Sequence, residues 1–428
     1  MKTFLLLLLA SVAFAQSNGA AGEANAVLPG AYQLYVDLHQ HPELSGHEVR
    51  TASVLADKLR GLGYEVTEHV GGTGVVALLK NGDGPTVLLR TELDALPVEE
   101  KTGLPYASKV RTKNDAGQEV GVMHACGHDI HLAALYGTAA VMARSRNTWR
   151  GTLFLIGQPA EETIGGARGM LSDGLFSRFP KPKYAVAFHD TNAEAAGKVS
   201  VSPGYILSNA DSIRVTVYGK GAHGSQPQSG IDPVLMAARI VVTLQSIVSR
   251  EIPPGEAAVV TVGYLHAGTK NNIIPDSAEM GLTVRSYSPE VRKRLLASID
   301  RIVRAEAEAA GAEKPPTIDH YESTPAVYND PELVARILPT LQQALGKENL
   351  EPGGRAMASD DFANYFAEGG VPEVMLSLGA ANPEKFREAR ASGRALPSNH
   401  SPLFAPDPEP TLRTGIVAEA AVLRNLLQ

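Results

Sequence analysis

The sequence predicts an α/β protein in which a mostly parallel, mixed sheet carries helices on both faces and a smaller, ferredoxin-like α+β domain is inserted. Its 428 residues exceed the roughly 250–300 that one hydrophobic core usually organises, so two domains are expected. In the first half of the chain, apolar strand patterns alternate with helical patterns, as they do in parallel sheets covered by helices. Farther on, the order strand–helix–strand–strand–helix–strand indicates a split βαβ unit.

The larger domain begins with short apolar strands and amphipathic helices. After a linker rich in glycine and alanine at Gly19–Ala26, a helical period begins at Val49 and ends at Gly61. The segment Asn81–Gly84 predicts a hairpin turn between two strands. The strands of this part are predicted at 64–70, 75–79, 87–89, 153–156 and 184–188, and an alanine-rich helix at 130–142.

The inserted domain is predicted over residues 206–322, between two parts of the larger domain at 16–205 and 323–428. Apolar residues alternate with polar ones from Ile213 to Val217, which predicts a half-exposed strand, and Asp232 followed by Pro233 marks the start of a helix. The other strands are expected at 259–265, 279–286 and 317–321, and the helices at 232–249 and 289–310. The returning chain is expected to form helices at 331–345 and 359–367, a strand at 374–378 and a last helix ending at Gln428.

The N-terminus has the pattern of a cleavable signal peptide over residues 1–15. Lys2 precedes the apolar run Phe4–Val12, and Ala13-Phe14-Ala15 has small residues at the positions that a signal peptidase recognises. We therefore expect a secreted or periplasmic protein that begins near Gln16, with an uncleaved anchor as the alternative. No later apolar run reaches the about 20 residues that span a bilayer. The net charge of −7, without a basic run, gives no support for a nucleic-acid partner.

The single cysteine, Cys126, lies in the segment His124-Ala125-Cys126-Gly127-His128-Asp129. A cysteine and a histidine two positions apart at the start of a helix can turn a thiolate and an imidazole toward one ion, and a thiolate suits zinc and can bridge two ions. A lone cysteine is as often a small buried apolar residue, so this segment alone leaves both interpretations open.

Further candidates for chemistry lie where predicted strands end. Glu161 and Glu162 follow the strand at 153–156, and His189 follows the strand at 184–188. Ligands of open α/β sheets bind beyond the carboxyl ends of the strands, which is where these side chains would lie. His400 lies in a polar loop before the last helix and is a weak signal alone. A solvated acidic loop and hydrogen-bonded histidines are the structural alternatives.

Taken together, these motifs resemble the metal-dependent amidohydrolases that include hippurate hydrolase, bacterial aminoacylases and plant auxin-conjugate hydrolases, within the wider aminoacylase and carboxypeptidase group of two-metal peptidases. The likeness runs from His39 to the C-terminus. The matching stretches are 39–44, 93–97, 124–129, 158–162, 221–224, 231–233, 272–276 and 400–402.

The resemblance implies a role for each candidate residue. A bridging thiolate would come from Cys126, and the shells of two divalent ions (Zn²⁺ or Mn²⁺, with Co²⁺ or Ni²⁺ open) would be completed by His128, Glu162, His189 and His400. Glu161 would be the general base that acts on a metal-activated water. His223, in the satellite domain, would reach the substrate carbonyl oxygen. Asn272 and Arg285 lie where relatives contact the substrate's far carboxylate, although Arg285 is as readily a solvated strand residue.

The implied activity is hydrolysis of the amide bond of an N-acyl-amino acid or a similar small amide, and the satellite domain could form a homodimer. A dipeptidase or carboxypeptidase of the same family is one alternative, and a non-catalytic, metal-containing binding protein is another. The chain departs from the family at Glu92, at Asp360 and in the loop 190–194, where relatives have Asp, Glu and a proline-containing loop. These departures affect the expected substrate pocket and remove no expected ligand.

Overall fold

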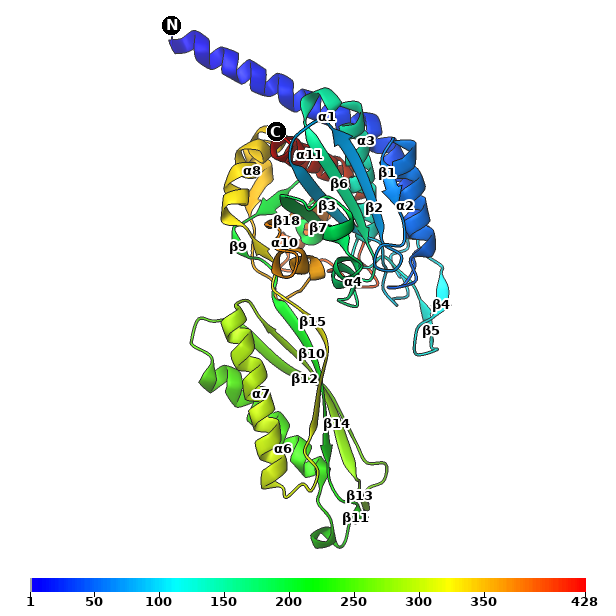
Figure 1. Cartoon of the computed structure of the whole chain (residues 1–428), viewed down its shortest axis with the longest axis vertical. Coiled ribbons are helices and arrows are strands. Elements are labelled where there is room, and N and C mark those ends of the chain that lie inside the picture. The colour runs from blue at the N-terminus through cyan, green and yellow to red at the C-terminus, as the bar shows by residue number, and fades with distance from the viewer. Residues whose placement is uncertain (1) are drawn as a thin grey trace. The chain divides into compact units, whose positions relative to one another are not determined.

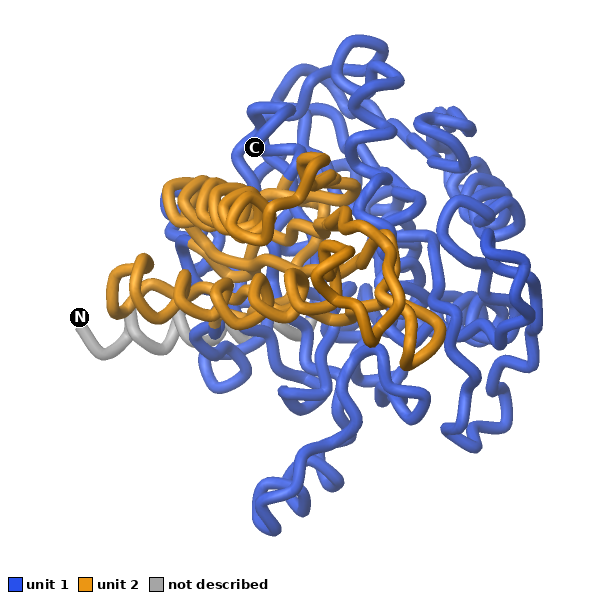
Figure 2. The backbone as a smooth tube through the Cα atoms, turned by 90° about the horizontal axis from the view of Figure 1, so that it is seen from below, with its two compact units in different colours: residues 1–204, 328–354, 364–428 blue, residues 205–327, 355–363 orange. Residues whose placement is uncertain are grey.

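The computed structural model describes the backbone of residues 2–428 and the side chains of residues 19–428. The signal peptide expected at 1–15 lies outside the residues whose side chains are described, and it stays a prediction. The chain divides into two compact units (Figure 2). The first comprises residues 1–204, 328–354 and 364–428, and the second comprises 205–327 and 355–363. The segment 355–363 groups with the second unit, whereas the sequence analysis placed it in the larger domain.

The first unit is built on a large mixed sheet (Figure 1). Its central strands are mutually parallel, and antiparallel strands extend it on both sides. In spatial order the strands are β1 (Glu65–Thr67), β2 (Val75–Asn81), β6 (Gly151–Gln158), β3 (Thr86–Glu92), β7 (Tyr184–Ala195), β18 (Glu373–Ala381), β8 (Val199–Val201) and β17 (Leu350–Pro352). A separate antiparallel pair joins β4 (Arg111–Lys113) to β5 (Glu119–Gly121).

Helices cover this sheet because its strands are apolar on both faces, as expected for buried parallel strands. Leu89 and Leu155 face the main core together with residues of the long helices, whereas Leu88 and Phe154 point the other way, where Phe179 packs on Phe154. The helices of the first unit are α1 (Lys2–Gln40), α2 (Val49–Gly61), α3 (His128–Arg144), α4 (Gly166–Ser172), α5 (Leu175–Arg178), α8 (Pro331–Leu345), α9 (Asn364–Ala367), α10 (Pro383–Ala391) and α11 (Pro408–Leu426).

Three local predictions for the first unit are wrong. The expected linker Gly19–Ala26 is part of α1, because Ala24 and the next turn of the helix are buried in the main core. The expected hairpin at Asn81–Gly84 does not form, since β6 inserts between β2 and β3 and Gly84 approaches the backbone of Gly151 closely. The helix expected at 359–367 is reduced to a short 3₁₀ turn and α9.

The second unit has the expected ferredoxin-like arrangement. Its antiparallel sheet has the order β12 (Ala258–Ala267), β14 (Ser277–Ser286), β10 (Asn209–Tyr218) and β15 (Thr317–Thr324). Two helices, α6 (Pro233–Ser246) and α7 (Pro289–Ala309), bury their apolar faces against this sheet. A small pair of strands, β11 (Ala222–His223) and β13 (Ile273–Ile274), extends from it. The short strands β9 (Gly204–Tyr205) and β16 (Tyr328–Asn329) lie where the chain passes from one unit to the other.

In the part of the chain that the structure describes, one helical stretch could cross a membrane by length and composition alone. It covers Pro233–Glu251, that is, α6 and the π-helical turn that follows. Its inner face, with Met236, Ile240 and Leu244, is buried in the core of the second unit. A single helix of this kind is weak evidence for a membrane span, because core helices of water-soluble domains pass the same test.

Candidate metal centre and active site

The candidate site is organised around the start of α3. Gly127 precedes the helix with a positive φ of 82°, which a residue with a side chain rarely adopts. A Cβ atom at Gly127 would lie 2.3 Å from a carboxylate oxygen of Asp190, so the backbone approaches β7 more closely than any other residue would allow. This turn presents Cys126 and His128 on the side of the helix that faces β7.

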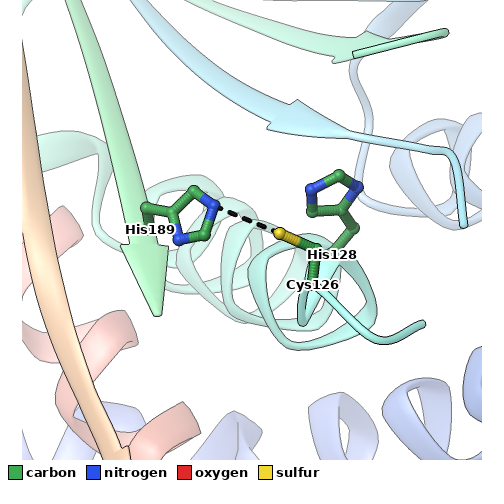
Figure 3. Close-up of side chains that lie close together, drawn as sticks. All are labelled: Cys126, His128 and His189. Carbon is green, nitrogen blue, oxygen red and sulfur yellow. Dashed lines mark hydrogen bonds between the residues drawn. The ribbon is translucent and has the colours of Figure 1, made fainter. Parts of the chain in front are cut away.

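The structure brings together all six residues that the sequence analysis assigned to metal binding and to the general base. Cys126, His128 and His189 point toward one another (Figure 3), with Cys126 Sγ 3.6 Å from His189 Nε2. Glu162 also lies close to the thiol, and one of its carboxylate oxygens is 3.5 Å from Nε2 of His400. Glu161 is beside them, at 3.7 Å from Nε2 of His128.

The spacing of these donor atoms suits metal ions. Two ligands of a tetrahedral zinc ion, each about 2.0–2.3 Å from it, are roughly 3.3–3.7 Å apart. The Cys126–His189 and Glu162–His400 distances of 3.6 and 3.5 Å fall in that range. Nε2 of His128 is buried and has no hydrogen-bond partner among the described residues. Cys126 belongs to two triads of candidate ligands, one with His128 and His189 and one with Glu162 and His400, which is the arrangement that a bridging thiolate requires.

The loop after β6 delivers the two glutamates. Ala160 has a positive φ of 51° and its N–H donates to Glu48 at 2.8 Å. The N–H of Glu162 donates to Asp94 at 2.9 Å. These buried carboxylates at 48 and 94 therefore fix the backbone that carries Glu161 and Glu162, and they explain why the pair leaves the strand at a sharp bend.

Backbone carbonyl groups orient two of the histidines. Nδ1 of His128 donates to the carbonyl oxygen of Asp94 at 2.9 Å, and Nδ1 of His189 donates to that of Asp190 at 2.9 Å. A hydrogen on Nδ1 leaves Nε2 as the lone-pair donor on the side of the cluster, the usual arrangement for a metal-binding histidine. His189 lies within β7, which continues to Ala195, rather than after the end of a strand as the sequence analysis expected.

His400 reaches the cluster from a loop. Its backbone has a positive φ of 68°, and its N–H donates to the carbonyl oxygen of Ala125 at 2.7 Å. The neighbouring Asn399 donates to the carbonyl oxygens of Cys126 and Asp190 at 3.1 and 3.3 Å. The loop is therefore tied to both segments that carry the other ligands, although the His400 side chain is 57% exposed.

Electrostatics at the site favours bound cations. Burial raises the pKa of the Cys126 thiol well above its usual range, and the negative charge of Glu162 raises it further. Burial alone would lower the pKa of His128, but the neighbouring side chains of Asp94 and Cys126 and the charge of Glu92 raise it well above the ordinary value. A cation among these groups would compensate the carboxylates and stabilise a thiolate, since a coordinating thiol loses its proton.

A second buried histidine–carboxylate cluster includes Asp129, the residue that follows His128. Nδ1 of His39 is 2.6 Å from Asp129 and Nε2 is 3.2 Å from Glu100, so both ring nitrogens have partners. Burial alone would lower the pKa of His39, but Asp129 and Glu100 raise it to about 10. The neighbouring His124 is also buried, and desolvation lowers its pKa to about 4. We refer to His39, Asp129 and Glu100 as the closed cluster.

Two residues at the site were not predicted from the sequence. Asp94 holds both His128 and the N–H of Glu162, and His131 contacts Glu92 and Asp190 behind His189. Asp94 follows β3 directly, so its place after a strand was an available signal. His131 follows His128 by three positions and therefore shares its face of the helix.

The remaining predicted site residues belong to the second unit. Nδ1 of His223 accepts hydrogen bonds from the N–H and the hydroxyl of Ser225 at 3.1 and 2.7 Å, and the side chain is exposed. Asn272 accepts a hydrogen bond from Gly224 on its carbonyl oxygen, and a cleft of about 560 Å³ adjoins this pair of strands. Arg285 donates to the carbonyl oxygen of Met357 and to Ser359, so it anchors the segment 355–363.

Comparison with known proteins identifies the family. The model of peptidase family M20/M25/M40 matches residues 88–391. The chain belongs to this family. It is 39% identical over 333 residues to a hippurate hydrolase of Campylobacter jejuni, with 77% of this chain and 83% of the relative covered. It is 35% identical over 399 residues to a thermostable carboxypeptidase of Saccharolobus solfataricus, with 91% and 93% covered.

A solved structure of a metal-binding relative is also similar over nearly the whole chain. The crystal structure of a dinuclear metal binding peptidase of the M20 family from Bacillus subtilis has a TM-score of 0.73 and 30% identity, with 93% of this chain and 98% of that chain covered. This M20 chain is therefore a metal-dependent amidohydrolase, and the predicted combination of a mostly parallel sheet and a satellite domain is confirmed.

Proposed function

We propose that this M20 amidohydrolase cleaves the amide bond of an N-acyl-amino acid or a similar small amide, with Glu161 as the general base. The observation that carries the proposal is the convergence of one sulfur, three imidazoles and two carboxylates at the spacing of metal ligands. In this proposal Cys126, His128, Glu162, His189 and His400 hold two divalent ions, and Glu161 holds none.

In the proposed chemistry the ions activate a water molecule and the side chains of the protein transfer its proton. When bound, the ions would supply a water molecule whose pKa is lowered from its bulk value toward about 7. Glu161 takes the proton of that water and later delivers it to the leaving nitrogen, as one carboxylate can serve as base and then as acid. Its side chain is 8% exposed and lies 3.7 Å from His128, which places it at the edge of the ligand set.

His223 is proposed to stabilise the negative charge that develops on the substrate carbonyl oxygen. Because the N–H of Ser225 donates to Nδ1 of His223, the hydrogen of the neutral ring resides on Nε2. The exposed Nε2–H is then a donor with no competing role, as an oxyanion requires.

The choice of N-acyl-amino acids over peptides as substrates is supported by the likeness to a hippurate hydrolase, and no single contact in the site decides it. One relative is named a hippurate hydrolase and another a carboxypeptidase, so dipeptidase or carboxypeptidase activity is the second candidate. A non-catalytic metal-containing binding protein is the third. The presence of Glu161 beside the proposed ligands disfavours it.

Export, the metal and the oligomeric state belong to the same proposal. We propose export on the pattern of residues 1–15, and Zn²⁺ or Mn²⁺ as the ions, with Co²⁺ or Ni²⁺ as alternatives, on the mixture of thiolate, imidazole and carboxylate donors. A homodimer through the second unit is supported by the apolar outer face of α6, where Leu235 and Val242 are 60% and 72% exposed.

The experiment is a hydrolysis screen on protein whose metal content has been measured. Panels of N-acetyl-amino acids, N-benzoyl-amino acids and dipeptides are compared after loading with Zn²⁺, Mn²⁺, Co²⁺ or Ni²⁺. We expect turnover of N-acyl-amino acids that chelation abolishes and metal restores. Turnover of dipeptides alone would favour the second candidate, and metal-loaded protein that hydrolyses none of the panels would favour the third.

A further inference from the structure

Behind the proposed ligand His189 lies a buried network that the mechanism does not use. His131, on α3, is one helical turn after His128, and its ring centroid is 4.9 Å from that of His189. Nδ1 of His131 is 3.0 Å from a carboxylate oxygen of Glu92, and Glu92 is paired in turn with Arg90. The side chains of His131, Glu92 and Arg90 are buried, so the contacts among them exchange little with water.

The other nitrogen of His131 holds the backbone of β7. The N–H of Asp190 donates to Nε2 of His131 at 2.8 Å. The pairing of β3 with β7 ends at Arg90 and Ala187, so the imidazole ring takes the place of a strand carbonyl as the acceptor for this buried N–H. The N–H of Asp190 and the carbonyl group of His189 belong to one planar peptide, and a contact that fixes this peptide also fixes the main chain of His189.

The hydrogen on the His131 ring is assigned by these contacts. Burial alone would lower the pKa of His131, but the carboxylates of Glu92 and Asp190 raise it to about 9, which favours a second proton. The N–H of Asp190 nevertheless points at Nε2 from 2.8 Å and leaves no room for a hydrogen there. We therefore take the ring as singly protonated, with Nδ1–H donating to Glu92 and Nε2 accepting.

The Asp190 backbone is held from its other end as well. Its carbonyl oxygen accepts hydrogen bonds from Nδ1 of His189 at 2.9 Å and from Asn399 at 3.3 Å. The contact with Nδ1 decides which nitrogen of His189 faces Cys126. A rotation of the Asp190 backbone would therefore move both the main chain and the ring orientation of His189.

We infer that His131 is a positioning residue, which holds the backbone of Asp190 and through it the His189 imidazole in the orientation that a metal ion requires. This inference rests on the metal centre proposed above and adds a residue that touches neither the ions nor the substrate in that proposal. Loss of its acceptor would leave a buried N–H without a partner, and a turn of the peptide that lets this N–H find another acceptor would move His189.

Two substitutions separate the contacts of the ring. The side-chain amide of His131→Gln reaches the position of Nε2 and can accept from Asp190, whereas the shorter amide of His131→Asn reaches the position of Nδ1 and can contact only Glu92. Zn²⁺ affinity is measured by competition with a chromophoric chelator, ligand geometry by the visible absorption of the Co²⁺-loaded protein, and stability by the melting temperature of the metal-free protein.

We expect His131→Gln to bind Zn²⁺ within about threefold of the wild type and His131→Asn to bind it about 10–100-fold more weakly, the usual range for groups that orient a ligand. The Co²⁺ spectrum should shift only in His131→Asn, while the metal-free melting temperatures of the two variants stay alike. If His131→Asn does not fold, His131→Met, which has no comparable acceptor, takes its place with the same expectation.

Equal Zn²⁺ affinities in the two variants, or losses that follow the metal-free melting temperature, would overturn the positioning role and leave the proposed metal centre intact. Failure of the wild-type chain itself to bind divalent ions would overturn the metal centre and this inference with it. The two failures are therefore distinguished by the wild-type measurement.

Discussion

Two buried clusters of histidine and carboxylate meet at the start of α3, and they differ in how their donor atoms are spaced. In the closed cluster, His39 contacts its two carboxylates at 2.6 and 3.2 Å, so each ring nitrogen has a hydrogen-bond partner. The second cluster consists of the proposed ligands Cys126, His128, Glu162, His189 and His400 with Glu161, and we refer to it as the metal cluster. There the contacts of the three imidazoles with neighbouring donor atoms are 3.5–3.7 Å long. Residue types alone do not mark a metal site. The candidate metal site differs from the closed cluster in that its donor atoms are held apart at the spacing of metal ligands.

The same contrast predicts what each cluster contributes. Groups that satisfy one another stabilise the fold, and breaking such a buried pair is costly because it leaves a charge without a partner. Groups held apart need a cation, so their loss should affect metal binding and turnover more than folding. Four measurements test this division between the clusters.

The largest effect is expected for Glu161→Gln in the metal cluster. Loss of the general base should lower kcat by about 10²–10⁴-fold, while metal content and melting temperature stay near those of the wild type. The adjacent Glu162→Gln is the matched comparison and should lower metal content instead. Steady-state kinetics with elemental analysis measure both, and a fully active Glu161→Gln enzyme would remove the assignment of the base.

His39→Leu should act on folding alone. It leaves the buried carboxylates of Glu100 and Asp129 unpaired, so the free energy of unfolding should fall by about 3–5 kcal/mol in denaturant titrations. The control is His41→Leu, because His41 is exposed and its loss should change stability by less than about 0.5 kcal/mol. Lower metal content in the His39 variant at full stability would contradict the division.

Cys126→Ala should affect metal binding and leave the stability of the metal-free protein unchanged, the opposite of His39→Leu. Removal of the shared ligand should weaken the binding of both ions by about 10–100-fold or more. That range is the usual one for the loss of a group that only orients a metal ligand. The metal-free protein should keep its melting temperature, whereas the rise in melting temperature on adding Zn²⁺ should shrink. Unchanged metal occupancy by elemental analysis would refute the bridging role.

The smallest effect is the pH dependence of the closed cluster. Its histidine is surrounded by Asp129, Glu100, Tyr35 and Tyr106, and its pKa rises from 6.5 to about 10 on folding. The stabilisation is then complete below about pH 6.5 and is lost as the pH rises through about 10. The stability difference between wild type and His39→Leu should shrink over that interval. A difference that stays constant between pH 6.5 and 10 would show that the ring is neutral in the folded protein.

The proposed metal ligands could be chosen from the sequence because some follow an apolar strand and others lie in one compact segment, although His189, expected after a strand, lies within β7. Glu161 and Glu162 follow a clearly apolar strand, and Cys126 and His128 share a short motif. The closed cluster was not predicted, because the partners of His39 are 61 and 90 positions away and no local pattern joins them. His131 was missed for a related reason: its contacts with Glu92 and Asp190 exist only after the strands are aligned side by side.

The errors in the fold have the same origin. Residues 81–84 have the composition of a hairpin turn, but the buried apolar strand β6 pairs with β2 and separates it from β3. The segment Gly19–Ala26 has the composition of a linker, yet its apolar side is covered by α3 and α11. Tertiary packing overrides local preference in both cases.

The interrupted path of the chain has a consequence for how the protein is made. The second unit needs residues 355–363 in addition to 205–327, and Arg285 binds that late segment through Met357 and Ser359. On the ribosome, the inserted unit therefore stays incomplete until the chain has been synthesised past residue 363. The central sheet of the first unit likewise stays incomplete until β18 has been synthesised. Synthesis cannot deliver a finished first domain before the second, and a fragment ending at residue 327 would lack part of both.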